Sequence, residues 1–215
     1  MNNSTEQIIS NLKERYPKLE VLSVKKAVEE IIDCYKQRNK LLVCGNGGSA
    51  SDSLHIVGEL MKGFLLPRKL DKKKQERIKT LFPETAQYFI DNLQGTLPAI
   101  SLVSETALLT AYANDQASDL SLAQQVLGHW NTGDILIAIS TSGNSKNVIY
   151  AAQIAKVQGM KVISLTGSKG GKLKEISDIL INVPSDETYI IQEYHLPVYH
   201  AICAAVENEI FSEEN

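Results

Sequence analysis

The sequence predicts an α/β protein built on a doubly wound, parallel, five-stranded sheet flanked by helices. Three observations support this fold class. Short apolar runs suited to strands alternate with segments of helical periodicity. The connections between the runs are too long for hairpins. The run 134–140 is dense in isoleucine and leucine, as expected for a strand that is covered on both faces. In such a sheet, ligands bind outside the carboxyl ends of the strands.

The first 38 residues are expected to form a helical hairpin. Val24, Val28, Ile31 and Tyr35 recur at helical spacing, and Pro17 separates a short first helix from this second one. A hairpin alone offers too little partner surface, so the stripe must pack on the main domain or on another subunit. It also fits a role in subunit assembly.

The remaining elements follow in order. The expected strands are 40–44, 99–103, 134–140, 161–166 and 179–183, and the expected helices are 49–62, 106–112, 120–127, 146–158, 173–176 and 188–211. Pro197 is expected to interrupt the last helix. The whole chain, 1–215, is expected to be one domain.

Residues 64–98 depart from the alternating pattern. They contain a basic cluster, internal prolines and modest helical periodicity, which predict a helical insertion that acts as a lid or as a subunit contact. The lysines fit a solvated helix face, and the alternative is a basic rim that attracts an anionic substrate.

Composition excludes several classes of protein. A net charge of −3 gives no reason to expect a nucleic-acid or anionic-membrane partner. No apolar run approaches the roughly 20 residues that span a bilayer, and the N-terminus does not resemble a secretory signal. The three cysteines are widely spaced without a CxxC pair, which indicates free thiols in a reducing cytosol. A cytoplasmic protein is therefore expected.

The stretch Gly45–Leu60, GNGGSASDSLHIVGEL, contains the first candidate site. An apolar strand breaks there into a glycine turn and then starts a helix, which leaves backbone N–H groups, including that of Gly47, free for a phosphate. Ser49 adds a hydroxyl. His55 and Glu59 are spaced i and i+4, so they lie on one helix face. They are either a surface pair or part of an active site.

The second candidate site, STSGNS, begins where the strand 134–140 ends. It carries four hydroxyls that together suit a phosphate without any full positive charge: Ser140, Thr141, Ser142 and Ser145. The alternative is a capped βα turn, which needs only one such residue. The chain has no GxxxxGK[ST] motif, and the glycine loop does not continue as GxGxxG. No nucleotide cofactor is therefore expected.

The C-terminal helix contains four polar residues, Gln192, Glu193, His195 and His200, in an otherwise apolar stretch. Polar side chains in such surroundings suggest a third part of the site. A hydrogen-bonded core histidine is the alternative for one of them.

Five separated segments, taken together, resemble the sugar isomerase (SIS) domain family and within it the phosphoheptose isomerases. The segments are GNGGSASDSLHIVGEL, AYAND, GDILIAISTSGNSKNV, GMKVISLTGSKGGKL and IQEYHLPVYHAICAAVE. They occur in the family's order and span nearly the whole chain except about 64–98. The family usually has an arginine after the glutamate, as in LTGRY, where this chain reads LMKGF. The compact members lack the insertion.

The resemblance implies a role for each matching residue. The phosphate would be held by Ser49, Ser140, Thr141, Ser142 and Ser145, and the rest of the substrate would contact Asn46, Gly47, Asp115 and Gln192. Glu59 would be the catalytic base and His200 the acid. Some members bind zinc through positions that match His55, Glu59, Gln192 and His200, so zinc is an expected site ion.

The resemblance implies an aldose–ketose isomerase that acts on a sugar phosphate through an enediol. The expected substrate is sedoheptulose 7-phosphate, and the expected assembly is a homotetramer in which neighbouring subunits complete the pockets. Two non-catalytic alternatives are a regulator that binds sugar phosphates and a SIS protein that binds the replication initiator. The initiator-binding branch lacks the carboxylate and the second histidine and has Arg where Ser142 stands, so this chain resembles the isomerases more.

Overall fold

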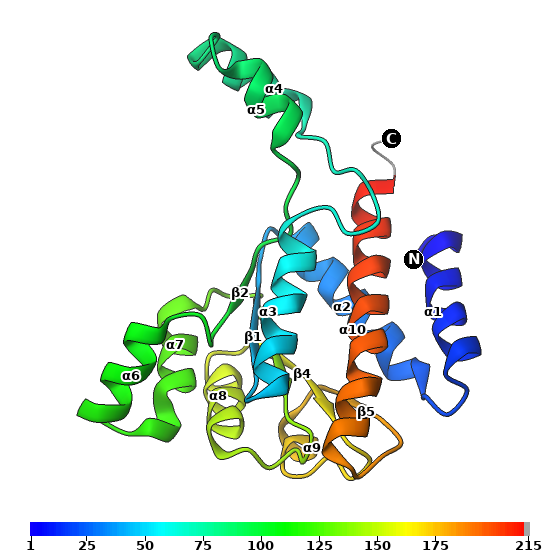
Figure 1. Cartoon of the computed structure of the whole chain (residues 1–215), viewed down its shortest axis with the longest axis vertical. Helices are drawn as coiled ribbons and strands as arrows, with labels where there is room; N and C mark the ends of the chain where they lie inside the picture. Colours follow the sequence, from blue (N-terminus) through cyan, green and yellow to red (C-terminus); the bar gives the residue numbers. More distant parts are fainter. Residues whose placement is uncertain (213–215) are drawn as a thin grey trace.

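A parallel five-stranded sheet forms the centre of the computed structural model, which describes residues 1–212 (Figure 1). Its strands are β1 (Leu41–Cys44), β2 (Ala99–Ser101), β3 (Ile135–Ile139), β4 (Lys161–Thr166) and β5 (Ile179–Asn182). All neighbouring strands pair in parallel, in the order β2-β1-β3-β4-β5. The predicted fold class is confirmed.

Helices cover both faces of the sheet. One layer contains α1 (Asn3–Arg15), α2 (Val21–Lys36), α3 (Gly48–Met61) and α10 (Thr188–Phe211), and the other contains α7 (Ser121–His129), α8 (Lys146–Val157) and α9 (Leu173–Ile176). Strand residues alternate between the two layers, because successive side chains point to opposite faces. Val43 and Ile137 lie in the first core, and Leu42 and Leu136 lie in the second.

The N-terminal hairpin belongs to the first core. Val24, Val28 and Ile31 expose at most 1% of their surface, and Tyr35 is also buried. The expectation that this stripe packs on the main domain is confirmed. The suggested role of the stripe in subunit assembly is wrong, because the sheet and α10 of the same chain already cover it.

Helix α10 continues through Pro197 from Thr188 to Phe211, so the expected interruption is wrong. Proline lacks the N–H that would bond to the carbonyl four residues earlier, which belongs to Glu193. Glu193 is exposed, so water can serve that carbonyl in place of the missing helix bond.

The insertion forms two helices, α4 (Lys72–Leu81) and α5 (Ala86–Asn92), which project away from the body as an arm (Figure 1). Asp71 caps α4 by accepting a hydrogen bond from the Lys74 N–H at 2.9 Å. The two helices pack against each other and bury only Ala86 of their own residues. In this structure the arm does not fold over α3 and α10, so the expected lid is not observed.

The last helical segments are α6 (Thr106–Asp115) and the short 3₁₀ helix η1 (Ser118–Leu120), which lie at one side of the molecule (Figure 1). None of the helices in residues 1–212 is long and apolar enough to cross a membrane.

The order of the strands fixes the place of the site. The connection from β1 leads to one side of the sheet and that from β3 leads to the other, so the loops after these neighbouring strands diverge. A ligand crevice is expected at such a switch point. The glycine loop after Cys44 and the hydroxyl loop after Ile139 both begin there.

Candidate active site

The hydroxyl loop Ser140–Ser145 lies between the buried strand β3 and the N-terminus of α8. The Oγ atoms of Ser140 and Ser145 are 2.9 Å apart, and the Asn144 N–H donates to Ser142 Oγ at 3.1 Å. Ser140 is buried and Thr141 half-buried. Four hydroxyls therefore gather in one short loop at the start of a helix, which suits a phosphate.

Two amide side chains connect the glycine loop to the start of α8, next to the hydroxyl loop. Asn46 and Asn147 exchange hydrogen bonds, Nδ2 to Oδ1 in each direction, at 2.8 and 2.9 Å. Asn147 stands in the first turn of α8, one residue beyond the Lys146 that follows the STSGNS motif, and the sequence alone assigns it no role. Ser49, which was expected as part of the phosphate grip, is buried at the start of α3.

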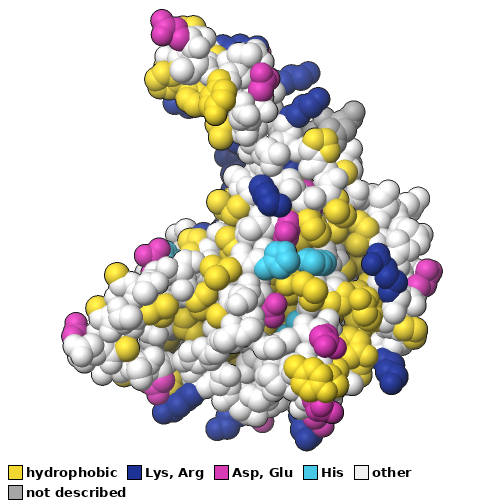
Figure 2. Space-filling model, in the orientation of Figure 1, with side chains coloured by type: hydrophobic (Ala, Val, Ile, Leu, Met, Phe, Trp, Pro, Cys, Tyr) yellow, Lys and Arg dark blue, Asp and Glu magenta, His cyan; other side chains and the backbone are white. Residues whose placement is uncertain are grey.

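His55 and Glu59 make the contact that their spacing predicted. His55 Nε2 lies 3.1 Å from Glu59 Oε1, and Lys62 Nζ donates to Glu59 Oε2 at 3.0 Å. His200 of α10 joins them, with its Nε2 3.5 Å from that of His55. Figure 2 shows histidine side chains in the middle of the face over α3 and α10, bordered by acidic and apolar surface.

Tyr199 of α10 holds the His55 ring through the ring nitrogen that faces away from Glu59. Its hydroxyl lies 3.0 Å from His55 Nδ1 and donates to Asp52 Oδ1 at 3.3 Å. Burial raises the pKa of Tyr199, and the nearby charge of Asp52 raises it further, so the phenol keeps its proton. Burial also raises the pKa of Asp52, although the Tyr199 hydroxyl opposes this. The sequence alone assigns no role to Tyr199 or Asp52.

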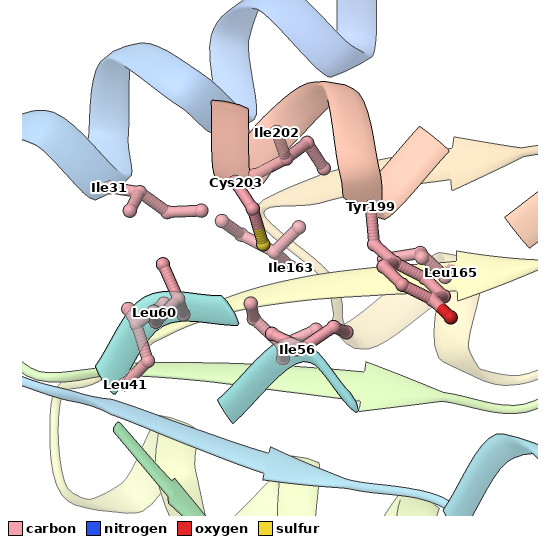
Figure 3. A pocket seen from close by; sticks show the side chains of 10 residues that line it. Ile31, Leu41, Ile56, Leu60, Ile163, Leu165, Tyr199, Ile202 and Cys203 are labelled. Atoms are coloured by element: carbon pink, nitrogen blue, oxygen red, sulfur yellow. The ribbon is translucent and has the colours of Figure 1, made fainter. Parts of the chain in front are cut away.

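The two helices that carry these groups are fixed to each other by apolar packing. Ile56 and Leu60 of α3 face Tyr199 and Cys203 of α10 around a cavity of about 10 Å³ (Figure 3). An apolar gap of this size offers water no hydrogen-bond partner. The side chains of the site therefore extend from a dry, packed base.

The pKa of His200 is lowered. Burial is the main cause, the neighbouring His55 adds to it, and the Glu59 carboxylate opposes it. A neutral imidazole with a free lone pair is therefore favoured at this position near pH 7.

Gln192 lies at the other end of α3 from Glu59. Its amide contacts Gly48, where a Cβ atom would collide with it. The structure therefore brings together three members of the expected zinc set, His55, Glu59 and His200, and leaves Gln192 near the glycine loop. Within residues 1–212, no group of three or more His, Cys, Asp or Glu side chains is arranged to hold a metal ion.

Two other polar residues lie apart from this cluster. Asp115 is exposed at the end of α6 and accepts a hydrogen bond from Asn114. Within residues 1–212, no hydrogen bond or ion pair joins it to the loops at the switch point. His195 is fully buried, with Nε2 3.4 Å from the Thr166 carbonyl oxygen, so it is the core histidine among the polar candidates on α10.

Known proteins are similar to this chain in both sequence and fold. The SIS domain model matches residues 79–167. A phosphoheptose isomerase of Citrifermentans bemidjiense is 39% identical over 189 residues, which are 88% of this chain and 85% of the relative. The phosphoheptose isomerase structure from Neisseria gonorrhoeae is 33% identical, with a TM-score of 0.72 over 93% of both chains. The corresponding structure from Francisella tularensis is 30% identical, with a TM-score of 0.74 over 96% of both.

These similarities cover 88% to 96% of the chain. On this evidence the chain belongs to the phosphoheptose isomerase family of SIS-domain proteins.

Proposed function

We propose that this protein interconverts sedoheptulose 7-phosphate and an aldose heptose 7-phosphate. The observation that carries the proposal is the meeting of Glu59, His55 and His200 on two packed helices, in a chain whose switch-point loops suit a phosphate. The names of the relatives support the same substrate class.

The carboxylate of Glu59 removes the proton from C1 of the ketose, which gives an enediol. His200 moves the proton at oxygen or at C2, and reprotonation at C2 completes the exchange. Each positioned transfer contributes roughly 10²–10⁴ in rate. The phosphate grip contains Ser49, Ser140, Thr141, Ser142 and Ser145, and it positions the far end of the sugar. Asn46, Gly47, Asp115 and Gln192 contact the remainder of the substrate.

Zinc is part of the proposal: His55, Glu59 and His200 would hold it, although within residues 1–212 these side chains are not arranged around an ion. Because Tyr199 donates to Asp52, its oxygen accepts the proton of His55 Nδ1, which leaves the Nε2 lone pair of His55 facing both Glu59 and His200. His55 Nε2, Glu59 Oε1 and His200 Nε2 repel one another unless a proton or a cation lies between them. Imidazole nitrogens and a carboxylate are common zinc ligands, and the two histidine Nε2 atoms are 3.5 Å apart. Bound zinc would polarise the substrate carbonyl.

The proposed roles of Glu59 compete, because a carboxylate bound to zinc is not at the same time a free base. A metal titration with a chromophoric chelator separates the two roles. If zinc is held as proposed, Tyr199→Phe weakens its affinity about tenfold or more, since it removes the hydroxyl that orients His55. Equal affinity in the variant contradicts the zinc site.

We also infer a homotetramer with shared pockets, in the cytoplasm. Helix α6 buries none of its residues within this chain although it contains two leucines and three alanines, and Asp115 at its end is exposed. A second copy that covers α6 accounts for both observations. The three cysteines are buried free thiols, which suits a reducing compartment.

Turnover of sedoheptulose 7-phosphate by the purified protein tests the proposal, with and without zinc. Glu59→Gln is expected to bind the substrate and to lose at least a hundredfold in kcat. Glu193→Gln is the matched control, since Glu193 is an exposed carboxylate on the neighbouring helix, and it should keep full activity. Wild-type turnover by a folded Glu59→Gln protein, or saturable binding without turnover by the wild type, would refute the isomerase assignment.

A further inference from the structure

A buried ion pair joins the segment that leads into the arm, just before α4, to the C-terminal helix α10. Arg68 Nε donates to Glu207 Oε1 at 2.7 Å, and neither side chain is exposed. Glu207 also accepts the backbone N–H groups of Phe64, Leu65 and Leu66 at 2.7 to 3.1 Å. Every oxygen of this carboxylate is therefore used, as burial of a charge requires.

The rest of the Arg68 guanidinium contacts the end of α3. Nη1 donates to the Leu60 carbonyl at 2.6 Å, and Nη2 donates to the Glu59 carbonyl at 3.0 Å. The last four carbonyls of a helix have no partner inside the helix, and a cation there also offsets the negative end of the helix dipole. Arg68 therefore caps the last turn of α3 from within the protein.

Glu59 stands in that same turn, two residues before α3 ends at Met61. An uncapped helix end frays, and a displacement of about 1 Å in a catalytic group costs as much as a hundredfold in rate. Lys62, which binds Glu59 Oε2, directly follows the turn and depends on its geometry as well.

We propose that Arg68 is a positioning residue that fixes the Glu59 carboxylate by holding the backbone of the last turn of α3 against Glu207. The proposal rests on the assigned role of Glu59 as the base. It gives the insertion a part in the reaction: the irregular segment before α4 provides the guanidinium, although the arm itself projects away from the site (Figure 1).

The test uses two variants of this ion pair. Arg68→Met/Glu207→Gln removes both charges and keeps an acceptor oxygen for the N–H groups of Leu65 and Leu66. We expect its kcat to fall ten- to a hundredfold while its KM changes less than about twofold, because the phosphate grip lies on other loops. Arg68→Lys keeps the charge and loses the fork that reaches two carbonyls, so its kcat is expected to lie between those of the double variant and the wild type.

A matched control comes from the other end of the sheet. Lys40 and Asp134 form a second, partly buried ion pair at 2.5 Å, at the amino ends of β1 and β3. Lys40→Met/Asp134→Asn should lower stability and leave kcat unchanged. An equal fall of kcat in this control, or full kcat in a folded Arg68→Met/Glu207→Gln protein, overturns the proposal. If that double variant does not fold, Arg68→Lys decides: wild-type kcat overturns the proposal, and a lowered kcat at unchanged KM supports it.

A second readout is independent of turnover. The chain has four histidines, so the ring resonances of His55 can be assigned by NMR with single substitutions. Because His55 contacts the Glu59 carboxylate, its ring signals should shift in Arg68→Met/Glu207→Gln and stay in place in the Lys40/Asp134 control. Unchanged His55 signals in the former contradict the positioning role, even if the wild type turns over no sugar phosphate.

Discussion

His195 shows how a buried histidine ties stability to pH. It is fully buried, Nε2 meets one carbonyl, and Nδ1 has no partner within residues 1–212. Burial lowers its pKa from 6.5 to about 4. The unfolded chain thus binds a proton below pH 6.5 that the folded chain refuses until about pH 4. The stability that this residue contributes is complete above pH 6.5 and is lost as the pH falls through that window.

We expect the free energy of unfolding to drop by roughly 2 kcal/mol between pH 7 and pH 5 because of His195 alone. His195→Gln, which keeps an N–H donor for the Thr166 carbonyl, should remove that part of the pH dependence. Urea unfolding of both proteins at the two pH values measures the difference. His129→Gln serves as the control, since His129 is partly exposed. Identical pH dependence in the wild type and His195→Gln would refute the assignment.

At the same scale, the sequence predicted residues whose partners lie within one helix. His55 and Glu59 needed only the i, i+4 rule. The contact of His55 with His200, and the support from Tyr199, depend on how α3 and α10 pack, which no local pattern reports. The role of Arg68 could not be predicted for a related reason. It lies in a cluster of lysines typical of a solvated helix face, and its partner Glu207 lies near the other end of the sequence.

At the scale of elements, the phosphate loop is tightly packed against a second loop. Gly143 has φ +65°, and a Cβ atom there would collide with the Gly170 carbonyl oxygen. Leu173 N–H donates to the Gly143 carbonyl at 3.1 Å, which fixes the two loops to each other. The conformation of the hydroxyl loop therefore depends on a residue that makes no contact through a side chain.

Gly143→Ala is expected to destabilise the protein by about 2–4 kcal/mol, from overpacking together with the left-handed backbone. It should also raise KM more than it lowers kcat, because the phosphate grip is displaced. Gly159→Ala is the control: its φ is +72°, but nothing lies within 4 Å of the added Cβ. It should cost only about 1–2 kcal/mol and leave the kinetics unchanged. Thermal unfolding and steady-state kinetics check both, and equal effects of the two substitutions would contradict the loop argument.

The elements themselves could largely be read from the sequence. Apolar runs and glycine turns predicted each strand to within two residues, because a buried parallel strand needs little else. The continuity of α10 could not be read in this way, because the cost of Pro197 depends on whether solvent reaches the freed carbonyl. The direction of the arm could not be predicted either, since α4 and α5 are helical for local reasons and bury almost nothing.

At the scale of the whole molecule, a single chain neither buries any residue of α6 nor brings Asp115 to the site that contains Glu59. If the pocket combines Asp115 of one subunit with Glu59 of another, two inactive variants can rescue each other. Co-expressed Glu59→Gln and Asp115→Ala chains should recover about a quarter of the wild-type activity by random mixing, since some pockets receive neither substitution. If both residues act within one chain, every pocket has a defect and no activity returns.

The control mixes Glu59→Gln with Glu59→Ala, which cannot complement in either arrangement. Sedimentation of the wild type accompanies the assay, because a monomer would contradict shared pockets directly.

The two ends of the arm meet where it leaves the body: the Gly95 N–H donates to the Arg68 carbonyl at 2.7 Å. A segment whose ends already touch can be lengthened, shortened or exchanged while the rest of the chain keeps its path. Each doubling of such a loop costs only about 0.6 kcal/mol in closure entropy. In evolutionary terms, this position allows a gene to gain or lose a module in a single step, provided that Arg68 at the junction and its contacts with Glu207 and α3 are kept.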